Sequence, residues 1–146
     1  MGFRDLSPAQ AHALLERERV IRIAFTEGDD RFLVPLFYVF HAGALYGLTT
    51  NGRKTALARA NPAVAFQVDS TATTGPYAWE SVAGQGVWAE VTDDAAIMAF
   101  VPLIQAKLAD SPLWAQRLLA QRLATLGRVA WSITPTALSG RAHEPD

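Results

Sequence analysis

The sequence contains no cysteine, and this absence removes several classes of protein at once. A disulfide framework, a thiolate metal site and a cysteine nucleophile are excluded, and the composition fits a reducing compartment. The chain also lacks any run of about 18 uncharged apolar residues, so no membrane span is expected. Its N-terminus turns amphipathic instead of forming the apolar core of a secretory signal. We therefore expect a cytoplasmic protein.

A basic excess is missing as well. The 13 Lys and Arg residues are balanced by 14 Asp and Glu residues, which gives a net charge of -1 and a pI of about 6.3. Domains that bind nucleic acid usually carry a clear positive excess, so no nucleic-acid partner is expected. The 146 residues, of which 50% are hydrophobic and 18% charged, suffice for one folded domain with a substantial core.

Helix signals lie near the start and in the last third of the chain. Ser7 is a good N-cap, with Pro8 at the first helical position and Gln10 placed to close a capping box. Two further helices are predicted, one capped by residues 92–94 and running to about Leu108, the other starting at 111–112 and ending at Gly127.

Strand signals dominate between these helices. Val20–Phe25 alternates, and a nearly continuous apolar strand over 31–40 is expected to form a hairpin with 44–50 through a three-residue loop. Pro35 inside that strand requires a sheet edge, a bulge or a backbone that faces a ligand. Residues 63–69, 79–91 and 128–134 give further strands, with Gly84 and Gly86 marking a bulge or a close approach. The pattern therefore predicts a mainly β, α+β fold.

The segment 45–55, with the sequence Leu-Tyr-Gly-Leu-Thr-Thr-Asn-Gly-Arg-Lys-Thr, is the strongest functional signal. An apolar strand leads into a glycine turn, the cations Arg53 and Lys54, and the hydroxyl donors Thr49, Thr50 and Thr55. A short helix that follows would direct its N-terminal amides to the same place, as phosphate sites require. The alternative is an ordinary turn with two solvated cations. Since cations oppose the dipole at a helix N-terminus, a compensating anion is the better interpretation.

A nucleotide-hydrolysing phosphate loop is a near match that fails. Gly47, Gly52 and the Lys-Thr pair at 54–55 almost give Gly-x-x-x-x-Gly-Lys-Thr, but Arg53 shifts the register by one residue. That loop also belongs between a parallel strand and a full-length helix, which this hairpin-rich chain does not offer.

The sequence contains no recognisable pattern of catalytic side chains. His12, His41 and His143 have no metal-ligand spacing, and no Gly-x-Ser-x-Gly elbow surrounds a serine. No acid/base pair of carboxylates emerges either. We therefore assign no catalytic residue and no metal, and expect a bound phosphorylated organic cofactor to carry the chemistry.

Taken together, the segments resemble the flavin-binding split-barrel proteins of the pyridoxamine 5'-phosphate oxidase-like superfamily, in the branch that includes the nitroimidazole-resistance proteins. The resemblance spans most of the chain. It rests on the N-terminal helix and on six later segments in this order: 21–25, 34–38, 45–54, 61–64, 79–82 with the nearby Gly86, and 138–141.

This resemblance implies a six-stranded antiparallel split β-barrel with flanking helices, forming a single FMN-binding domain over 1–146 with an ordered core of about 5–141. It also implies a homodimer with the cofactor at the interface. Arg53 and Lys54 match the family's phosphate-binding cations, and Thr49 with its neighbour Thr50 matches the hydroxyl at the strand end. The backbone of Val34, Pro35, Leu36 and Phe37 would border the isoalloxazine ring, and Ser81 takes the place of a polar side chain against the flavin.

Two departures from the family pattern limit what the resemblance implies. In nitroimidazole-resistance proteins a histidine commonly stands just before the phosphate motif. In this sequence Leu48 or Thr49 occupies that place. The C-terminal aromatic and arginine residues that true pyridoxamine phosphate oxidases use for vitamin B6 have no match after Trp131. Neither reaction is therefore expected here.

The resulting hypothesis is an FMN-binding oxidoreductase that transfers hydride or electrons to an unidentified small molecule, with NAD(P)H as a candidate reductant. Two alternatives stay open at this level. One is an F420-dependent reductase of the same fold, and the other is a non-catalytic dimer that binds flavin or haem.

Overall fold

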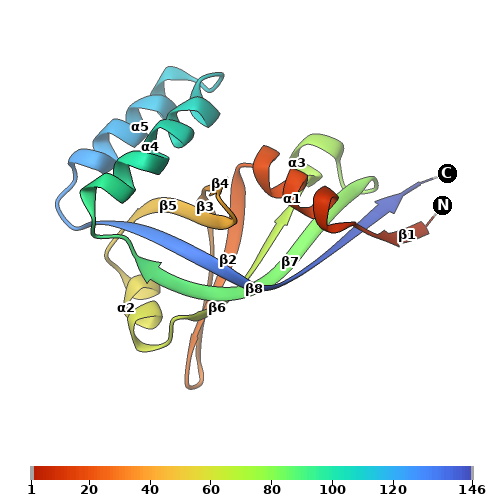
Figure 1. The fold of residues 1–146 in the computed structure, drawn as a ribbon, viewed down its shortest axis with the longest axis horizontal. Helices are drawn as coiled ribbons and strands as arrows, with labels where there is room; N and C mark the ends of the chain where they lie inside the picture. The colour runs from red at the N-terminus through yellow and green to blue at the C-terminus, as the bar shows by residue number, and fades with distance from the viewer. Residues whose placement is uncertain (1, 146) are drawn as a thin grey trace.

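The computed structural model describes residues 2–145 (Figure 1). Eight strands are formed: β1 (Gly2–Asp5), β2 (Val20–Glu27), β3 (Asp30–Phe37), β4 (Val39–His41), β5 (Ala44–Thr50), β6 (Ala63–Asp69), β7 (Trp79–Glu90) and β8 (Arg128–Glu144). Five helices accompany them: α1 (Pro8–Arg17), α2 (Arg53–Ala60), α3 (Thr71–Thr74), α4 (Asp94–Leu108) and α5 (Leu113–Ala124).

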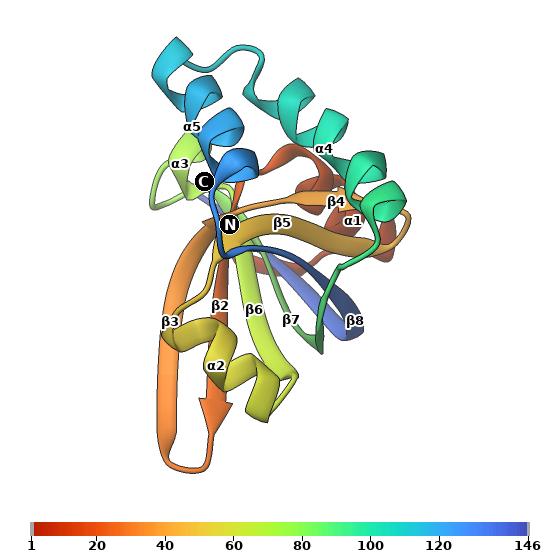
Figure 2. The same cartoon turned by 90° about the vertical axis from the view of Figure 1, so that its left-hand side faces the viewer.

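All strands belong to one antiparallel sheet with the order β3-β2-β6-β7-β8-β5-β4, and β1 pairs with β8. The two terminal strands of this order, β3 and β4, are neighbours in the sequence and are separated only by Tyr38. The sheet must therefore curl until its two edges meet at Tyr38, which produces a half-closed barrel. Figure 2 shows β4 and β5 crossing over the ends of β2, β3 and β6.

The prediction of one long strand over 31–40 is wrong, because the strand is interrupted at Tyr38. Its backbone amide donates to the carbonyl of Arg19 at 3.2 Å, and its buried hydroxyl donates to the carbonyl of Leu15 at 2.7 Å. These bonds tie the residue to the end of α1, so the strand divides there and its halves pair with different neighbours. The split, together with the terminal strand β1, contributes to a total of eight strands where six were expected.

The predicted hairpin is also shorter than expected. Of the residues predicted to form its first strand, only those in β4 pair with β5. His41 lies opposite Ala44, so the turn has two residues and not three. Both turn residues, Ala42 and Gly43, have positive φ angles of 49° and 79°, which is the geometry of a tight hairpin turn.

β8 runs on to Glu144, far beyond the strand predicted over 128–134. It pairs with β5, β7 and β1 in succession, and its register with β7 shifts between Gln85 and Gly86. Pro135 lies at this irregularity, where its missing amide donor costs the ladder least. The irregularity predicted from Gly86 is thus confirmed.

The barrel core centres on two stacked indoles. Trp131 is fully buried and lies parallel to Trp88, with ring centroids 5.1 Å apart. Gly47 on β5 faces the indole so closely that an added Cβ would lie 2.4 Å from a Trp131 ring carbon. The absence of a side chain at Gly47 therefore lets β5 approach the core at the point where it leads to Thr49.

The helical hairpin of α4 and α5 packs over β4, β5 and β8 (Figure 1). Four residues of α4 are buried, Ile97, Phe100, Val101 and Ile104, whereas α5 has no buried residue. The predicted caps are confirmed both here and at the first helix, because Asp93 caps α4 and Ser7 caps α1 through a complete capping box. α5 is thus the more loosely held half of the hairpin.

Lys107 fastens α4 to the barrel. Its ammonium donates to the carbonyl of Glu18 and to that of Tyr38, the latter at 3.4 Å, and lies 4.4 Å from the centroid of the Tyr38 ring. The pKa of Lys107 falls to about 8, first because the ammonium is buried and then because Arg19 repels it. Glu18 and Glu16 oppose this shift.

Lys107 is expected to make stability rise with pH above about 8. Between that folded-state pKa and the ordinary value of 10.5, the folded protein has released a proton that the unfolded chain still holds. Urea unfolding of wild type and Lys107→Met from pH 7 to 10.5 measures the effect. The wild type should gain about 1 kcal/mol on the variant over this range, after allowance for solvent screening. Parallel pH curves would contradict the assignment.

Candidate functional site

A groove of about 310 Å³ lies between the barrel and the α4–α5 hairpin. The barrel side is formed by the end of β3 and by β5, and the roof by α4 and α5. Its lining residues are Pro35, Leu36, Phe37, Leu48, Thr49, Ile104, Leu108, Ala115, Leu118, Leu119 and Arg122. The walls are mainly apolar, with one hydroxyl and one guanidinium, and such a composition is typical of a cofactor pocket.

A larger hollow of about 500 Å³ lies between α1 and the later part of β8. None of the residues predicted to bind a cofactor lines it, and it contains no cluster of unpaired cations that would fit a phosphate. We therefore place the candidate site in the smaller groove.

Four of the predicted residues meet in this groove. Pro35, Leu36 and Phe37 come from β3, and Thr49 comes from β5. β3 is the edge of the sheet and pairs only with β2, which explains how a strand accommodates Pro35. The outer edge of β3 has no partner strand within the described chain, so its backbone is available to border a ligand.

Val34 and Thr50 lie next to the groove but do not line it. Val34 packs against the barrel core, and Thr50 is half-buried opposite Arg128. Their predicted contacts with a cofactor stay predictions.

Arg53 does not line the groove. Its guanidinium forms an ion pair with Asp30 at the start of β3 and lies 4.8 Å from the centroid of the Phe32 ring. Thr55 is likewise engaged, because its buried hydroxyl donates to the carbonyl of Gly52 and accepts from the Gly52 amide, both at 2.9 Å. The expectation that the Thr55 hydroxyl would donate to a phosphate is therefore wrong, since that hydroxyl is used to form the turn before α2.

Unlike Arg53 and Thr55, Lys54 is not engaged by a neighbouring side chain or turn among the described residues. It is half-buried in the first turn of α2, and within residues 2–145 its ammonium forms no ion pair. Burial lowers the pKa of Lys54, and the positive charge of Arg122 lowers it further. Arg122 lines the groove, whereas Lys54 does not, and the two cations are close enough for their charges to interact.

Arg122 is the site residue that the sequence reasoning missed. A signal was available, because Ala115, Leu118, Leu119 and Arg122 recur at helical spacing and all line the groove. That periodicity indicates an amphipathic helix whose polar end is a cation. The sequence could not show, however, that this face of α5 lies opposite the end of β3.

Ser81 is not brought to the groove. On β8, the partner of Thr49 is Val129 near the start of the strand, whereas the partner of Ser81 is Arg141 near its end. The Ser81 hydroxyl accepts from the Gln67 amide at 3.0 Å. Within one copy of the chain, Ser81 therefore lies apart from the predicted phosphate site.

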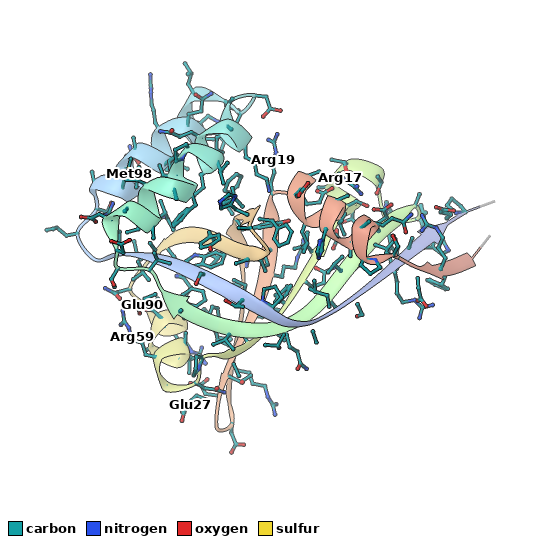
Figure 3. The ribbon with its side chains drawn as sticks, in the orientation of Figure 1. Arg17, Arg19, Glu27, Arg59, Glu90 and Met98 are labelled. Carbon is teal, nitrogen blue, oxygen red and sulfur yellow. The ribbon has the colours of Figure 1, made fainter. Side chains whose placement is uncertain are left out.

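Arg59 is the remaining cation of α2, and it is fully engaged. It pairs with Glu90 at 2.6 Å and donates to the Asn51 side chain at 2.7 Å, and Figure 3 shows Arg59 and Glu90 lying together near α2. Residues 2–145 contain no cluster of His, Asp and Glu that could hold a metal ion. None of the helices in the described part of the chain has the length and apolar character needed to cross a membrane.

The curled antiparallel sheet with flanking helices and a groove beside β3 and β5 defines a split-barrel protein. The sequence matches the family described as pyridoxamine 5'-phosphate oxidase over residues 7–142, so the chain belongs to this family. No curated protein shows significant sequence similarity to the chain.

Solved structures agree with this assignment. An FAD-binding protein from Mesorhizobium loti is 26% identical, with a TM-score of 0.78 and 98% of each chain covered. A Bacteroides thetaiotaomicron protein, provisionally assigned to 5-nitroimidazole antibiotic resistance, is 13% identical with a TM-score of 0.70, covering 99% of this chain and 93% of that one. The haem storage protein HutZ from Vibrio cholerae is 13% identical with a TM-score of 0.68, covering 92% and 94%. The latter two share the fold alone.

Proposed function

We propose that this protein binds FMN in the groove beside β3 and β5 and acts as a flavin-dependent oxidoreductase. The observation that carries the proposal is an apolar groove lined by Thr49 and Arg122, with Lys54 close enough for its charge to interact with Arg122 and with no ion-pair partner for either cation within residues 2–145. Lys54 and Thr49 would bind the phosphate, and the edge of β3 from Pro35 to Phe37 would border the ring. A bound flavin supplies hydride and single-electron transfer, so the protein needs only to bind, orient and shield it.

The donor set favours flavin over haem. A haem iron is held by a His, Met, Cys or Tyr side chain, and none of these residue types lines the groove. Deazaflavin F420 carries a longer anionic tail, which asks for several free cations. Arg53 and Arg59, however, are occupied by Asp30 and Glu90.

A homodimer would complete the site. The outer face of the sheet exposes small and apolar side chains, Leu33, Ala65, Ala83, Val87 and Ala89, on β3, β6 and β7. Exposed apolar side chains on one face of a sheet are typical of a protein interface. We propose that a second copy covers this face and contributes to the cofactor site, where Ser81 of one copy would approach the groove of the other.

The visible spectrum of the purified protein is the first test. We expect flavin absorbance that released cofactor identifies as FMN, in a protein whose sedimentation mass is that of a dimer. NAD(P)H oxidation with simple electron acceptors then separates an enzyme from a carrier, because tightly bound flavin without turnover would favour the carrier. A colourless protein that takes up no FMN on titration would refute the proposed function, and a flavin-bound monomer would refute the dimer.

A further inference from the structure

The segment that follows α5 is hydrogen-bonded to the segment that precedes α2. The Asn51 amide, just before α2, donates to the carbonyl of Gly127, just after α5, at 3.1 Å. Thr50 pairs with Arg128 in the neighbouring register of β5 and β8. These links join the segment that follows α5, the helix of Arg122, to the segment that precedes α2, the helix of Lys54.

Nearby cations other than Lys54 and Arg122 have partners. Arg53 is paired with Asp30, Arg59 is paired with Glu90, and the Arg128 guanidinium donates to the carbonyl of Leu123 at 3.1 Å. Among residues 2–145, the side chains of Lys54 and Arg122 form no ion pair, and their mutual repulsion is seen in the lowered pKa of Lys54. Within residues 2–145, the fold thus leaves two positive charges without an ion-pair partner, Arg122 lining the groove and Lys54 in the first turn of α2.

We infer that Arg122 is a second phosphate-binding residue, which holds a terminal phosphate dianion against Lys54 and thereby sets the preference for FMN. This inference rests on the proposed function, in that the phosphate is taken to belong to a flavin. A terminal phosphate carries a charge of about -1.5 to -2 at pH 7, which matches two cations. Each phosphate of the diester linkage in FAD carries a single charge, so FAD should fit this pair less well.

The arrangement also explains how α5 is held. This helix has no buried residue, and Leu118 over the groove is 50% exposed. Without an anion, the two cations repel each other, and this repulsion opposes a closer approach of α5 to α2. A bound phosphate turns that repulsion into two charge-assisted hydrogen bonds, which draw the roof of the groove onto the ligand.

The test compares FMN, FAD and riboflavin on Arg122→Gln, with Arg117→Gln as the control. Arg117 is exposed on the same helix but does not line the groove. In fluorescence titrations, Arg122→Gln should bind FMN about 10- to 100-fold more weakly than wild type, with riboflavin affinity unchanged. The FMN preference over FAD should shrink, and Arg117→Gln should match wild type with all three ligands.

Two outcomes with flavins would overturn the inference while leaving the proposed function intact. One is FMN binding by Arg122→Gln that equals wild type. The other is an equal loss of FMN and riboflavin affinity, which would show that Arg122 supports the groove wall and not the phosphate.

Inorganic phosphate is a second probe that does not depend on flavin binding. At matched ionic strength in chloride, phosphate should raise the Tm of wild type and of Arg117→Gln more than that of Arg122→Gln. This result with a wild type that binds no flavin would sink the proposed function and keep the anion site. An equal phosphate effect on all three proteins would overturn the anion site, since general exclusion of phosphate from protein surfaces acts on each alike.

Discussion

Replacing Trp131 by alanine is expected to destabilise the protein by about 3–5 kcal/mol, as for other large-to-small substitutions in a core. Trp131 is fully buried, stacks on Trp88, and fills the space that Gly47 leaves open. Since Gly47 has no side chain to move into the cavity, the loss cannot be relieved locally. Among residues 2–145 the Trp131 indole N–H has no hydrogen-bond partner, so no lost hydrogen bond adds to this figure.

Urea unfolding of Trp131→Ala beside Trp114→Ala measures this effect with a matched control. Trp114 lies on α5 with 66% of its surface exposed, and its removal should change stability by no more than about 0.5 kcal/mol. If Trp131→Ala fails to fold, Trp131→Phe leaves a smaller cavity and should show an intermediate loss. Equal stabilities for the variants at 131 and 114 would show that the stacked indoles do not anchor the barrel.

Replacing Lys54 by alanine is expected to weaken FMN binding about 10- to 100-fold, the value of one charge-assisted contact of roughly 1.5–3 kcal/mol. Riboflavin, which lacks the phosphate, should bind wild type and variant alike. The unliganded variant should be at least as stable as wild type, because the repulsion between Lys54 and Arg122 is gone. Fluorescence titration and thermal unfolding check the two expectations.

Arg53→Ala is the informative comparison for Lys54→Ala. Both residues match the phosphate-binding cations of the family, but the Arg53 guanidinium is bound to Asp30 and lies over Phe32. We therefore expect a smaller loss of FMN affinity from Arg53→Ala than from Lys54→Ala. Equal losses would mean that Arg53 leaves Asp30 when the ligand binds, and a wild-type affinity in Lys54→Ala would refute its role.

Local patterns in the sequence predicted much of the fold. Period-two alternation marked β2 and β6, and the caps at Ser7 and Asp93 marked the starts of α1 and α4. These signals are reliable because each depends on residues only a few positions apart. The same locality explains the errors. Nothing within 31–40 shows that the strand divides at Tyr38, since the division depends on hydrogen bonds to Leu15 and Arg19.

The candidate site also has features that the local sequence predicts and features that depend on long-range contacts. The strand, turn and cations of 45–55 indicated an anion site from neighbouring residues alone. Which of the two cations is free to bind an anion depends on residues outside this segment. Asp30 forms an ion pair with Arg53, whereas Lys54 is repelled by Arg122.

By itself, the sequence determined the classes of chemistry that this protein lacks, the alternation of strands and helices, and the segment that carries the phosphate signal. Only the tertiary structure decided that β3 and β4 form opposite edges of one curled sheet, and that α5 roofs the groove beside Thr49. The physical reason is that side-chain periodicity fixes which face of an element is buried, whereas long-range packing and charge decide which elements meet.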